Sequence, residues 1–340
     1  MIVSSAPGRC GIIGNPTDMY GGSVISCSTV ERARCTIMDS HSLVISVSGI
    51  VQPIRSADDM RLNGNYLDIP KAVLTYFRLD HNNFRCRLSA GSDIPECAGL
   101  AGSTALVVAV LGAVLEKIGV QMDKFAIAET ARKIEFGVMG IMCGYQDQHM
   151  ASFGGLNYMD FRGKEGLAQD ENEPLATVEP LQGNAEDLPI VVAHTGIKHN
   201  SGVVHKSIRQ RWEEGESAVV EGYLRIAELA RVGKKAILNS DWQTLGALMN
   251  ENHEIQRRLG GSGPQNDHLI GMAREHGALG AKLAGAGHGG TIVALTLEPD
   301  RTVRALRDAG VSRILWPRPL DGVSIEAGWQ QLVPEYAAGG

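Results

Sequence analysis

Three glycine-rich segments are the parts of this chain best suited to binding phosphate groups. They are residues 6–18 (APGRCGIIGNPTD), residues 94–104 (IPECAGLAGST) and residues 285–290 (GAGHGG). A lone glycine-rich loop is usually a plain turn, because glycine occurs wherever the backbone needs a positive φ or approaches another segment closely. Three of them in one chain are difficult to explain as turns, and together they favour an enzyme that handles phosphate.

The second segment stands directly before an apolar stretch, 103–118, which we expect to form a helix buried on all sides. Backbone N–H groups at the start of this helix would converge on an anion, which predicts a triphosphate site. They belong to Gly99, Leu100, Ala101, Gly102, Ser103 and Thr104. The segment lacks the Gly-Lys-[Ser/Thr] of a Walker A loop. Taken alone, it could equally be a strand-to-helix turn with hydroxyl caps.

Magnesium would make a second demand on this site, because it prefers oxygen ligands and usually takes few of them from protein. Ser103 or Thr104 can supply a hydroxyl. Glu135, at the end of an expected helix over 124–135, can supply a carboxylate. Most glutamates in such positions are simply solvated, so the assignment of Glu135 depends on the whole pattern.

Asp147 lies in a run of Gly, Met and Cys residues, GIMCGYQDQH (140–149). An unpaired charge in this apolar setting would be costly, so we expect a cation beside it. Arg9, in the first glycine-rich segment, is the candidate. Asp147 next to a guanidinium is a weak base but a good positioner of a hydroxyl. That is sufficient for phosphoryl transfer, in which positioning and charge neutralisation carry most of the catalysis.

Composition favours a globular protein that acts on small molecules. The 340 residues are 44% hydrophobic, and the length favours two domains. A net charge of -6 argues against nucleic-acid or anionic-membrane partners, which attract clustered Lys and Arg. The N-terminus has no signal-peptide pattern, and the apolar run 106–115 is shorter than the about 20 residues of a membrane span. We therefore expect a cytoplasmic location, with the six cysteines mostly free and buried.

The hydrophobic pattern predicts an α+β protein in two parts. In the first part we expect consecutive strands from 23 to 51, a strand at 83–89, and helices at 68–79, 103–118 and 124–135. The polar stretch 163–187 is typical of a surface hairpin or linker. Beyond it we expect strands at 189–194, 281–284, 291–297, 312–316 and 323–327, and helices at 205–232, 241–259, 264–276 and 299–309. The predicted domains are 1–187 and 188–340.

In order and spacing, these motifs resemble those of the GHMP kinases, the family of galactokinase, homoserine kinase, mevalonate kinase and phosphomevalonate kinase. The likeness spans nearly the whole chain and rests on Pro7-Gly-Arg9 with Gly14-x-x-Thr-Asp18, Gly-Leu-x-Gly-Ser-Thr104, Gly144-x-x-Asp147-Gln148 and Gly285-Ala-Gly-x-Gly-Gly290. It implies an N-terminal α/β domain similar to domain 2 of ribosomal protein S5, a ferredoxin-like C-terminal domain, and ATP and substrate between them.

The resemblance also implies a role for each matching residue. Asp147 would be the catalytic carboxylate and Arg9 its cationic neighbour, with Thr104 and Glu135 as magnesium ligands. The phosphates of ATP would lie against residues 99–104 and against Gly285, Ala286 and Gly287. ATP and Mg²⁺ are therefore the expected cofactors. The expected partner is a small sugar or sugar acid, and the sequence carries no signal for the oligomeric state.

The first motif departs from that of galactokinase, which has Gly-Glu-His-Thr-Asp where this chain has Gly14-Asn-Pro-Thr-Asp18. The Glu and His that meet the C6 hydroxyl of the sugar are replaced, while the Asp for ring hydroxyls remains. The form seen here, with Asn15, Asp18 and Tyr20, is most similar to that of plant glucuronokinases. Loss of a carboxylate at the C6 end would remove repulsion against a uronic acid. The resemblance thus implies phosphorylation of D-glucuronate at its anomeric hydroxyl.

A substrate carboxylate would need a cationic partner, and Arg209 and Arg211 could form an arginine fork for it. The alternative is that both are solvated cations at the start of a helix. The histidines at 194, 199 and 205 could suggest a metal cluster, but they straddle a strand end and a glycine turn, which disfavours that reading. His288 is a departure from the family pattern in the third glycine-rich segment.

Other functions remain open at this point. The chain could act on galactose, fucose or a heptose phosphate, or could bind ATP and sugar as a catalytically silent sensor. Retention of Arg9, Thr104, Glu135 and Asp147 argues against a silent protein. A dinucleotide-binding oxidoreductase is disfavoured, because no Gly-x-Gly-x-x-Gly opens a helix with an acidic residue about 20 positions later.

Overall fold

The computed structural model describes residues 1–164, 166, 173–181, 188–195, 208–285 and 290–326. Within these residues the larger sheet has eight strands in the order β12-β1-β2-β5-β3-β4, with β6 paired to β2 and β7 paired to β6. The strands are β1 (Ile2–Ile13), β2 (Ser23–Asp39), β3 (Leu43–Val47), β4 (Ile50–Ile54), β5 (Cys86–Ser92), β6 (Leu156–Asp160), β7 (Thr177–Pro180) and β12 (Ser324–Ile325).

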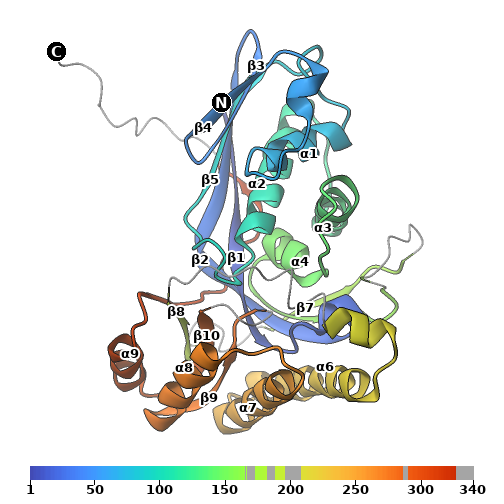
Figure 1. Cartoon of the computed structure of the whole chain (residues 1–340). Coiled ribbons are helices and arrows are strands. Elements are labelled where there is room, and N and C mark those ends of the chain that lie inside the picture. Colours follow the sequence, from blue (N-terminus) through green and yellow to red (C-terminus); the bar gives the residue numbers. More distant parts are fainter. Residues whose placement is uncertain (165, 167–172, 182–187, 196–207, 286–289, 327–340) are drawn as a thin grey trace, which may run out of the picture.

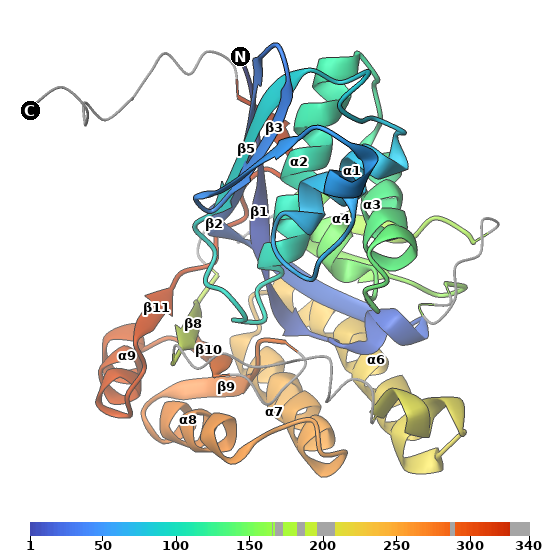
Figure 2. The ribbon, with the colours of Figure 1, turned by 45° about the horizontal axis from the view of Figure 1, so that its top comes forward.

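Four helices cover one face of this sheet (Figures 1 and 2). They are α1 (Asp68–Tyr76), α2 (Gly102–Ile118), α3 (Lys124–Lys133) and α4 (Gln146–Phe153). Every residue of α2 from Thr104 to Leu115 is buried, because α2 packs on β1 and β2 and is enclosed by the other helices. The prediction of a helix buried on all sides is confirmed for residues 104–115, whereas Ser103 and Glu116 are exposed.

The second part of the chain contains a four-stranded antiparallel sheet in the order β11-β8-β10-β9. Its strands are β8 (Ile190–His194), β9 (Ala278–Leu283), β10 (Thr291–Thr296) and β11 (Arg313–Leu315). The helices of this part are α6 (Ser217–Leu238), α7 (Trp242–Arg258), α8 (Pro264–Glu275) and α9 (Pro299–Asp308). Figure 1 shows them below the larger sheet. The arrangement is the ferredoxin-like domain that the resemblance implied.

Residues 6–13 of the first glycine-rich segment belong to β1, and residues 14–18 form the turn that follows it. A Cβ added at Gly8 would lie 2.8 Å from the carbonyl oxygen of Leu100, and one added at Gly11 would lie 2.8 Å from Oδ1 of Asn15. These glycines therefore allow other segments to press against a strand. Glycine at such a close approach is compatible with extended backbone.

Two other predictions of secondary structure were wrong in detail. The helix expected over 205–232 is interrupted, since Gly215 adopts φ +72° between a helical stretch at 208–213 and α6. The strand expected at 323–327 forms as β12, but it pairs with Ser4 and Ser5 of β1 in the larger sheet. The chain thus returns to its first part, and a domain boundary at 187/188 stays a prediction.

The remaining sequence-based expectations concern cysteines and membranes. Cys10, Cys27, Cys35 and Cys86 are free and buried as predicted, whereas Cys97 is exposed and Cys143 is half-buried. No helix in the part of the chain that the structure describes is long and apolar enough to cross a bilayer.

Candidate active site

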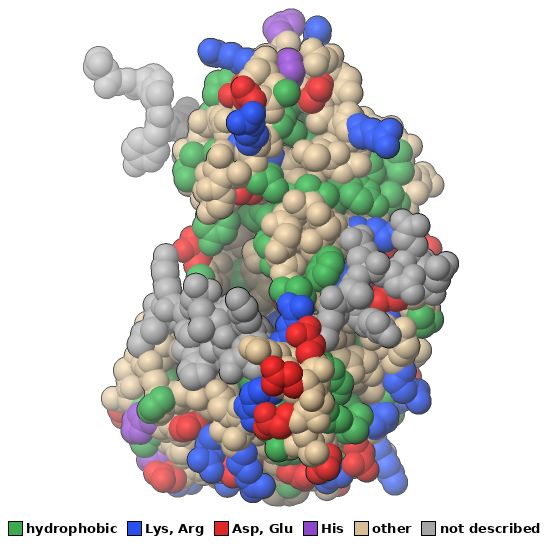
Figure 3. Space-filling model, turned by 45° about the vertical axis from the view of Figure 1, so that its right-hand side comes forward, with side chains coloured by type: hydrophobic (Ala, Val, Ile, Leu, Met, Phe, Trp, Pro, Cys, Tyr) green, Lys and Arg blue, Asp and Glu red, His purple; other side chains and the backbone are tan. Residues whose placement is uncertain are grey.

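A cavity of about 370 Å³ lies between the two parts of the molecule. The larger sheet and its helices contribute Arg9, Asp18, Glu135, Asp147 and residues 99–104 to its walls, and the second part contributes Asn266, Gly285 and Thr291. In the space-filling view, the surface is hollowed at the waist between the two parts (Figure 3). Residues far apart in the sequence therefore meet around one space large enough for small ligands.

The second glycine-rich segment wraps the N-terminus of α2, as the sequence predicted. Gly99 and Ala101 have left-handed backbone, with φ +67° and +58°, which turns the chain tightly into the helix. A Cβ added at Gly285 would lie 3.1 Å from Cα of Gly99, so two of the glycine-rich segments touch through their backbones. All six residues from 99 to 104 line the cavity. Free N–H groups at a helix N-terminus suit a phosphate. Ala286, Gly287 and His288 lie outside the described residues.

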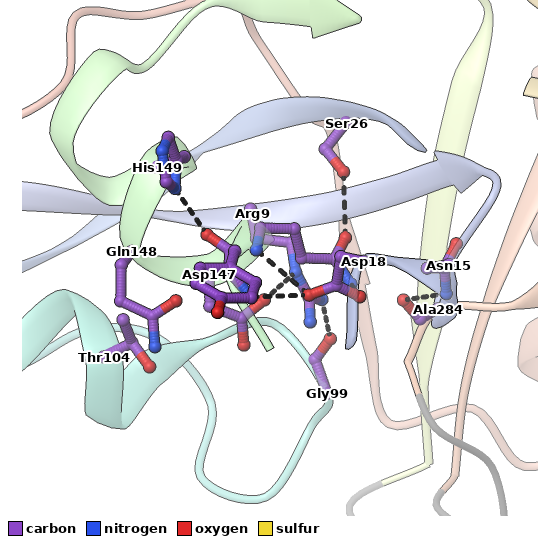
Figure 4. A network of polar contacts seen from close by, with 12 residues as sticks. Arg9, Asn15, Asp18, Ser26, Gly99, Thr104, Asp147, Gln148, His149 and Ala284 are labelled. Atoms are coloured by element: carbon purple, nitrogen blue, oxygen red, sulfur yellow. Dashed lines mark hydrogen bonds and ion pairs between the residues drawn. The ribbon is translucent and has the colours of Figure 1, made fainter. Parts of the chain in front are cut away.

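Arg9 and Asp147 meet on one wall of the cavity. Arg9 Nε donates to Oδ1 of Asp147 at 2.8 Å, and Arg9 Nη1 donates to the carbonyl oxygen of Gly99 (Figure 4). The side chain of Arg9 is 7% exposed and that of Asp147 is 30% exposed. The carboxylate therefore faces the cavity while its cationic partner is held behind it. The backbone N–H of Arg9 also donates to the carbonyl of Leu100, which couples β1 to the loop before α2.

Asp18 is buried beside this pair and binds the start of α4. Its Oδ2 accepts the backbone N–H groups of Tyr145 and Gln146, and its Oδ1 accepts Nε2 of Gln146 at 3.0 Å. A Cβ at Gly144 would collide with the same carboxylate. Burial, followed by the negative charge of Asp147, raises the pKa of Asp18 to about 6. Asp18 lines the cavity as predicted, and it also fixes the helix that carries Asp147.

Thr104 and Glu135 lie together at the start of α2. Thr104 Oγ1 donates to Oε1 of Glu135 at 2.8 Å, and Gln148 Nε2 donates to Oε2 at 2.6 Å. Glu135 sits in a π-helical turn, Ile134–Val138, that continues α3 and points the carboxylate at α2. Burial raises the pKa of Glu135 to about 7. A hydroxyl and a carboxylate beside a phosphate-binding helix end are a donor set that suits Mg²⁺.

Asn15 lines the cavity next to Asp18 and is held by the second part of the chain. Lys282 Nζ donates to Oδ1 of Asn15 at 2.8 Å. Asn252 of α7 accepts the backbone N–H of Gly14 at 3.0 Å. The sequence predicted a role for Asn15 but gave no role to Lys282 or to Gln148. The only signal for Lys282 was a single lysine inside the apolar strand that enters the third glycine-rich segment.

Three other predicted substrate-binding residues do not line this cavity. Tyr20 packs against Trp212 and Tyr223, with ring centroids 4.7 and 4.9 Å away. Arg209 Nε pairs with Glu213 at 2.9 Å. These contacts favour the solvated alternative for the cation at 209.

Arg211, like Arg209, forms an ion pair with a nearby glutamate. It pairs with Glu216 at 2.7 Å and donates to the carbonyl of Leu259. His194 bonds to Thr291, and the histidines at 199 and 205 lie outside the described residues, so the disfavoured histidine cluster is not tested.

Comparisons with known proteins agree with this geometry. The family model of the GHMP kinases N terminal domain matches residues 68–155, and that of the GHMP kinases C terminal domain matches residues 234–312. The chain is 30% identical to a mevalonate kinase of Pyrococcus horikoshii, over 96% of this chain and 98% of that protein. It is also 30% identical to glucuronokinase 1 of Arabidopsis thaliana, over 88% of this chain and 86% of that protein.

Among solved structures, a D-glycero-D-manno-heptose 1-phosphate kinase of Bacteroides thetaiotaomicron superposes with a TM-score of 0.74 at 22% identity, covering 97% of this chain and 100% of the other. At this identity the superposition supports the fold alone. The two sequence relatives cover 96% and 88% of this chain. The chain therefore belongs to the GHMP kinases, a family of ATP-dependent kinases that act on small metabolites.

Proposed function

We propose that this chain transfers the γ-phosphoryl group of ATP to the anomeric hydroxyl of D-glucuronate, giving D-glucuronate 1-phosphate and ADP. In this reaction the hydroxyl oxygen forms a bond to the γ-phosphorus, the bond from that phosphorus to the β,γ-bridging oxygen breaks, and the hydroxyl proton is released to solvent. Mg²⁺ would neutralise charge on the phosphates, and Thr104 and Glu135 would hold it.

The contact between Arg9 and Asp147 at the edge of the phosphate-binding loop carries the kinase assignment. Asp147 would accept a hydrogen bond from the attacking hydroxyl and orient it toward the phosphate. Arg9 pairs with the aspartate and, through Gly99, holds it at a defined place relative to the loop. Phosphoryl transfer depends mainly on such positioning and charge neutralisation.

The choice of a sugar acid rests on the residues at the other end of the cavity. Asn15 stands where galactokinase has a carboxylate, so a substrate carboxylate would meet an amide there instead of a like charge. Asp18 lies beside it, ready for ring hydroxyls. The 30% identity to a plant glucuronokinase supports this choice.

Mevalonate is the second candidate, because mevalonate kinases of Pyrococcus species are as similar to this chain as the glucuronokinases are. Mevalonate also bears a carboxylate, so both candidates demand an anion site. Galactose, fucose and heptose phosphates are the other candidate substrates.

ADP release in the presence of ATP and Mg²⁺ tests these alternatives directly. The panel should contain D-glucuronate, D-glucose, D-galactose, L-fucose and (R)-mevalonate at equal concentrations. We expect glucuronate to be used at least about 10-fold better than glucose or galactose, the lower end of what one charged hydrogen bond contributes. Equal rates with glucose and glucuronate would overturn the glucuronate assignment. ATP binding without ADP release on any compound would favour a sensor.

A further inference from the structure

Lys282 is a fully buried lysine on β9 that pairs with no carboxylate among the described residues. Its side chain is 0% exposed, and Nζ donates to Oδ1 of Asn15 at 2.8 Å and to the carbonyl oxygen of Leu283 at 2.6 Å. Neither acceptor carries a charge. Because burying an ammonium without a counter-charge costs stability, the fold alone gives no reason for a cation at this position.

The ionisable groups around Lys282 do not neutralise it. Arg9 and Cys10 approach it from β1, and His253 approaches from α7. Arg9 already has its counter-charge in Asp147. The thiol of Cys10 is buried, and burial raises its pKa to about 12, so it stays neutral. Lys282 therefore has no counter-charge among these groups, and the carboxyl group of Asp18 lies next to Asn15 on the cavity wall.

The ammonium also decides how the Asn15 amide is turned. An ammonium can only donate hydrogen bonds, so Oδ1 of Asn15 must face Lys282 and Nδ2 must face the other way. The nearest acceptor for Nδ2 is the carbonyl oxygen of Ala284 at 3.5 Å, the outer limit of a hydrogen bond (Figure 4). Asn15 lines the cavity. Its amide group is thus oriented as a donor that a ligand oxygen can still use.

Asn266 of α8 adds a second amide to this wall. It is 2% exposed, lines the cavity, and its Oδ1 has no hydrogen-bond partner among the described residues. Buried amide atoms are seldom left unpaired in folded proteins. A hydroxyl of a ligand that reaches this wall could donate to Oδ1 of Asn266, while another oxygen of the same ligand accepts from Asn15.

We infer that Lys282 is a specificity-determining positioning residue, which turns Asn15 into a donor and makes this end of the cavity select acceptor substrates that carry a carboxylate. The inference rests on the proposed function and replaces the expectation that Arg209 and Arg211 receive the substrate's carboxylate. Lys282 acts through Asn15, because Lys282 itself does not line the cavity.

Two anions could lie near the ammonium of Lys282, the carboxylate of the acceptor substrate or the terminal phosphate of ATP. The carboxylate fits better, because the ammonium donates to Asn15, in the segment that also carries Asp18, although the expected phosphate-binding residues from Gly285 onward follow Lys282 in the chain. The two sources are separable, since one changes the KM of the acceptor and the other changes the KM of ATP.

The test compares Lys282→Met, which removes the charge at similar length, with Lys282→Arg, which keeps it. Lys71→Met is a matched control, because Lys71 is also 0% exposed and also donates to a carbonyl, that of Arg61, away from the cavity. For each protein, kcat and KM are measured with D-glucuronate, with D-glucose and with ATP.

We expect Lys282→Met to lower kcat/KM for glucuronate by about 10- to 100-fold, mainly through KM. The kcat/KM for glucose and the KM of ATP should each change by less than about 3-fold. Lys282→Arg should recover part of the loss, and Lys71→Met should leave kcat/KM for both sugars unchanged. An equal loss on glucose and glucuronate would overturn the inference, and so would a rise confined to the KM of ATP.

The dependence on pH gives a readout that a structural role would not change. Burial lowers the pKa of Lys282 to about 7, so the ammonium is present at pH 6 and lost as the pH rises through 7. KM for glucuronate should rise between pH 6 and pH 8.5 relative to KM for glucose in the wild type. This rise should vanish in Lys282→Met and in Lys282→Arg, whose guanidinium does not titrate. An unchanged rise in both variants would assign it to another group of the cavity wall, such as Asp18 with its pKa of about 6, and contradict the inference.

The outcome remains decisive if the proposed function fails. Should the wild type phosphorylate (R)-mevalonate and not glucuronate, the same variants are assayed with mevalonate. A selective rise in its KM would then retain the role of Lys282 while the glucuronate assignment is lost. A wild type that uses only neutral acceptors would overturn both.

Discussion

Arg9 and Asp147 are 138 residues apart in the sequence and are joined by a hydrogen bond of 2.8 Å between Nε and Oδ1. The same guanidinium donates to the carbonyl of Gly99, at the turn before α2. One side chain on β1 therefore links the carboxylate at the start of α4 to the loop that would hold the phosphates. This linkage sets where an attacking hydroxyl and a phosphate can meet.

Replacing Asp147 by Asn keeps the size of the side chain and removes the charge that would orient the hydroxyl. Turnover should fall by about 10² or more, the range that acid–base groups typically supply, while ATP affinity stays near that of the wild type. Steady-state kinetics and titration with a fluorescent ATP analogue measure the two quantities. Asp300→Asn, at an exposed position in α9, is the control. Near-normal turnover in Asp147→Asn would remove that residue from catalysis.

Magnesium dependence should change when either predicted ligand loses its oxygen. Glu135→Gln and Thr104→Val should each raise the Mg²⁺ concentration needed for half-maximal rate, because each deletes a ligating or orienting oxygen. Thr130→Val is a matched control, since Thr130 is buried but its hydroxyl contacts only Met122 Sδ, at 3.8 Å, among the described residues. An unchanged magnesium titration in both test variants would place the ion elsewhere.

Much of the fold was predictable, because local pattern and tertiary environment agree in most elements. The apolar run after Gly102 and the Asp241 cap before α7 each specify a helix, and both helices form. The break at Gly215 was not predictable, since helical periodicity continues on both sides of it. The pairing of β12 with β1 was hidden as well, because a two-residue strand is defined by a distant partner and not by its own sequence.

The candidate active site was also predictable only in part. The sequence named Arg9 beside Asp147 and Thr104 beside Glu135, and the structure brings each pair into contact. Nothing in the sequence singled out Lys282, because a lysine is normally exposed. Lys282 is buried here because other segments pack over β9. A cation deep in an apolar strand is recognised only when the surrounding segments are placed.

Asp18 should give the stability of the protein a distinctive pH dependence. Its pKa of about 6 in the folded protein is above that of the unfolded chain, so its carboxyl group takes up a proton on folding between these values. The associated stability is present below about pH 4 and is lost as the pH rises through 6. A shift from 3.8 to about 6 corresponds to on the order of 3 kcal/mol.

Asp18→Asn should therefore become more stable relative to the wild type as the pH rises from 4 to 8. Urea unfolding across this range measures the difference. Asp241→Asn is the control, because hydrogen bonds from Thr244 lower the pKa of Asp241 below 3.8. Its contribution to stability therefore changes only below about pH 4, and the difference between Asp241→Asn and the wild type should stay nearly constant from pH 4 to pH 8. A pH-independent difference between Asp18→Asn and the wild type would show that Asp18 does not titrate as described.

The substitution Asn15→Glu tests the acid-selecting end of the cavity. A carboxylate there would repel a substrate carboxylate and would take the ammonium of Lys282 as its own partner. The kcat/KM for glucuronate should fall by about 10-fold or more, while neutral sugars are affected less. Asn15→Gln introduces a side chain of the same shape as Glu without the charge. The ratio of kcat/KM for glucuronate between the two variants therefore isolates the effect of the charge. Equal effects of Glu and Gln on both kinds of sugar would argue against selection by charge.

The central claim is that this cavity phosphorylates the anomeric hydroxyl of D-glucuronate, and the identity of the product tests it most directly. The wild-type protein is incubated with ATP, Mg²⁺ and glucuronate, and the product is examined by ³¹P and ¹H NMR. We predict a phosphomonoester whose phosphorus couples to the anomeric proton, formed together with one equivalent of ADP and absent with Asp147→Asn. A phosphoester at another carbon, or no sugar phosphate while glucose or mevalonate is phosphorylated, would contradict the account.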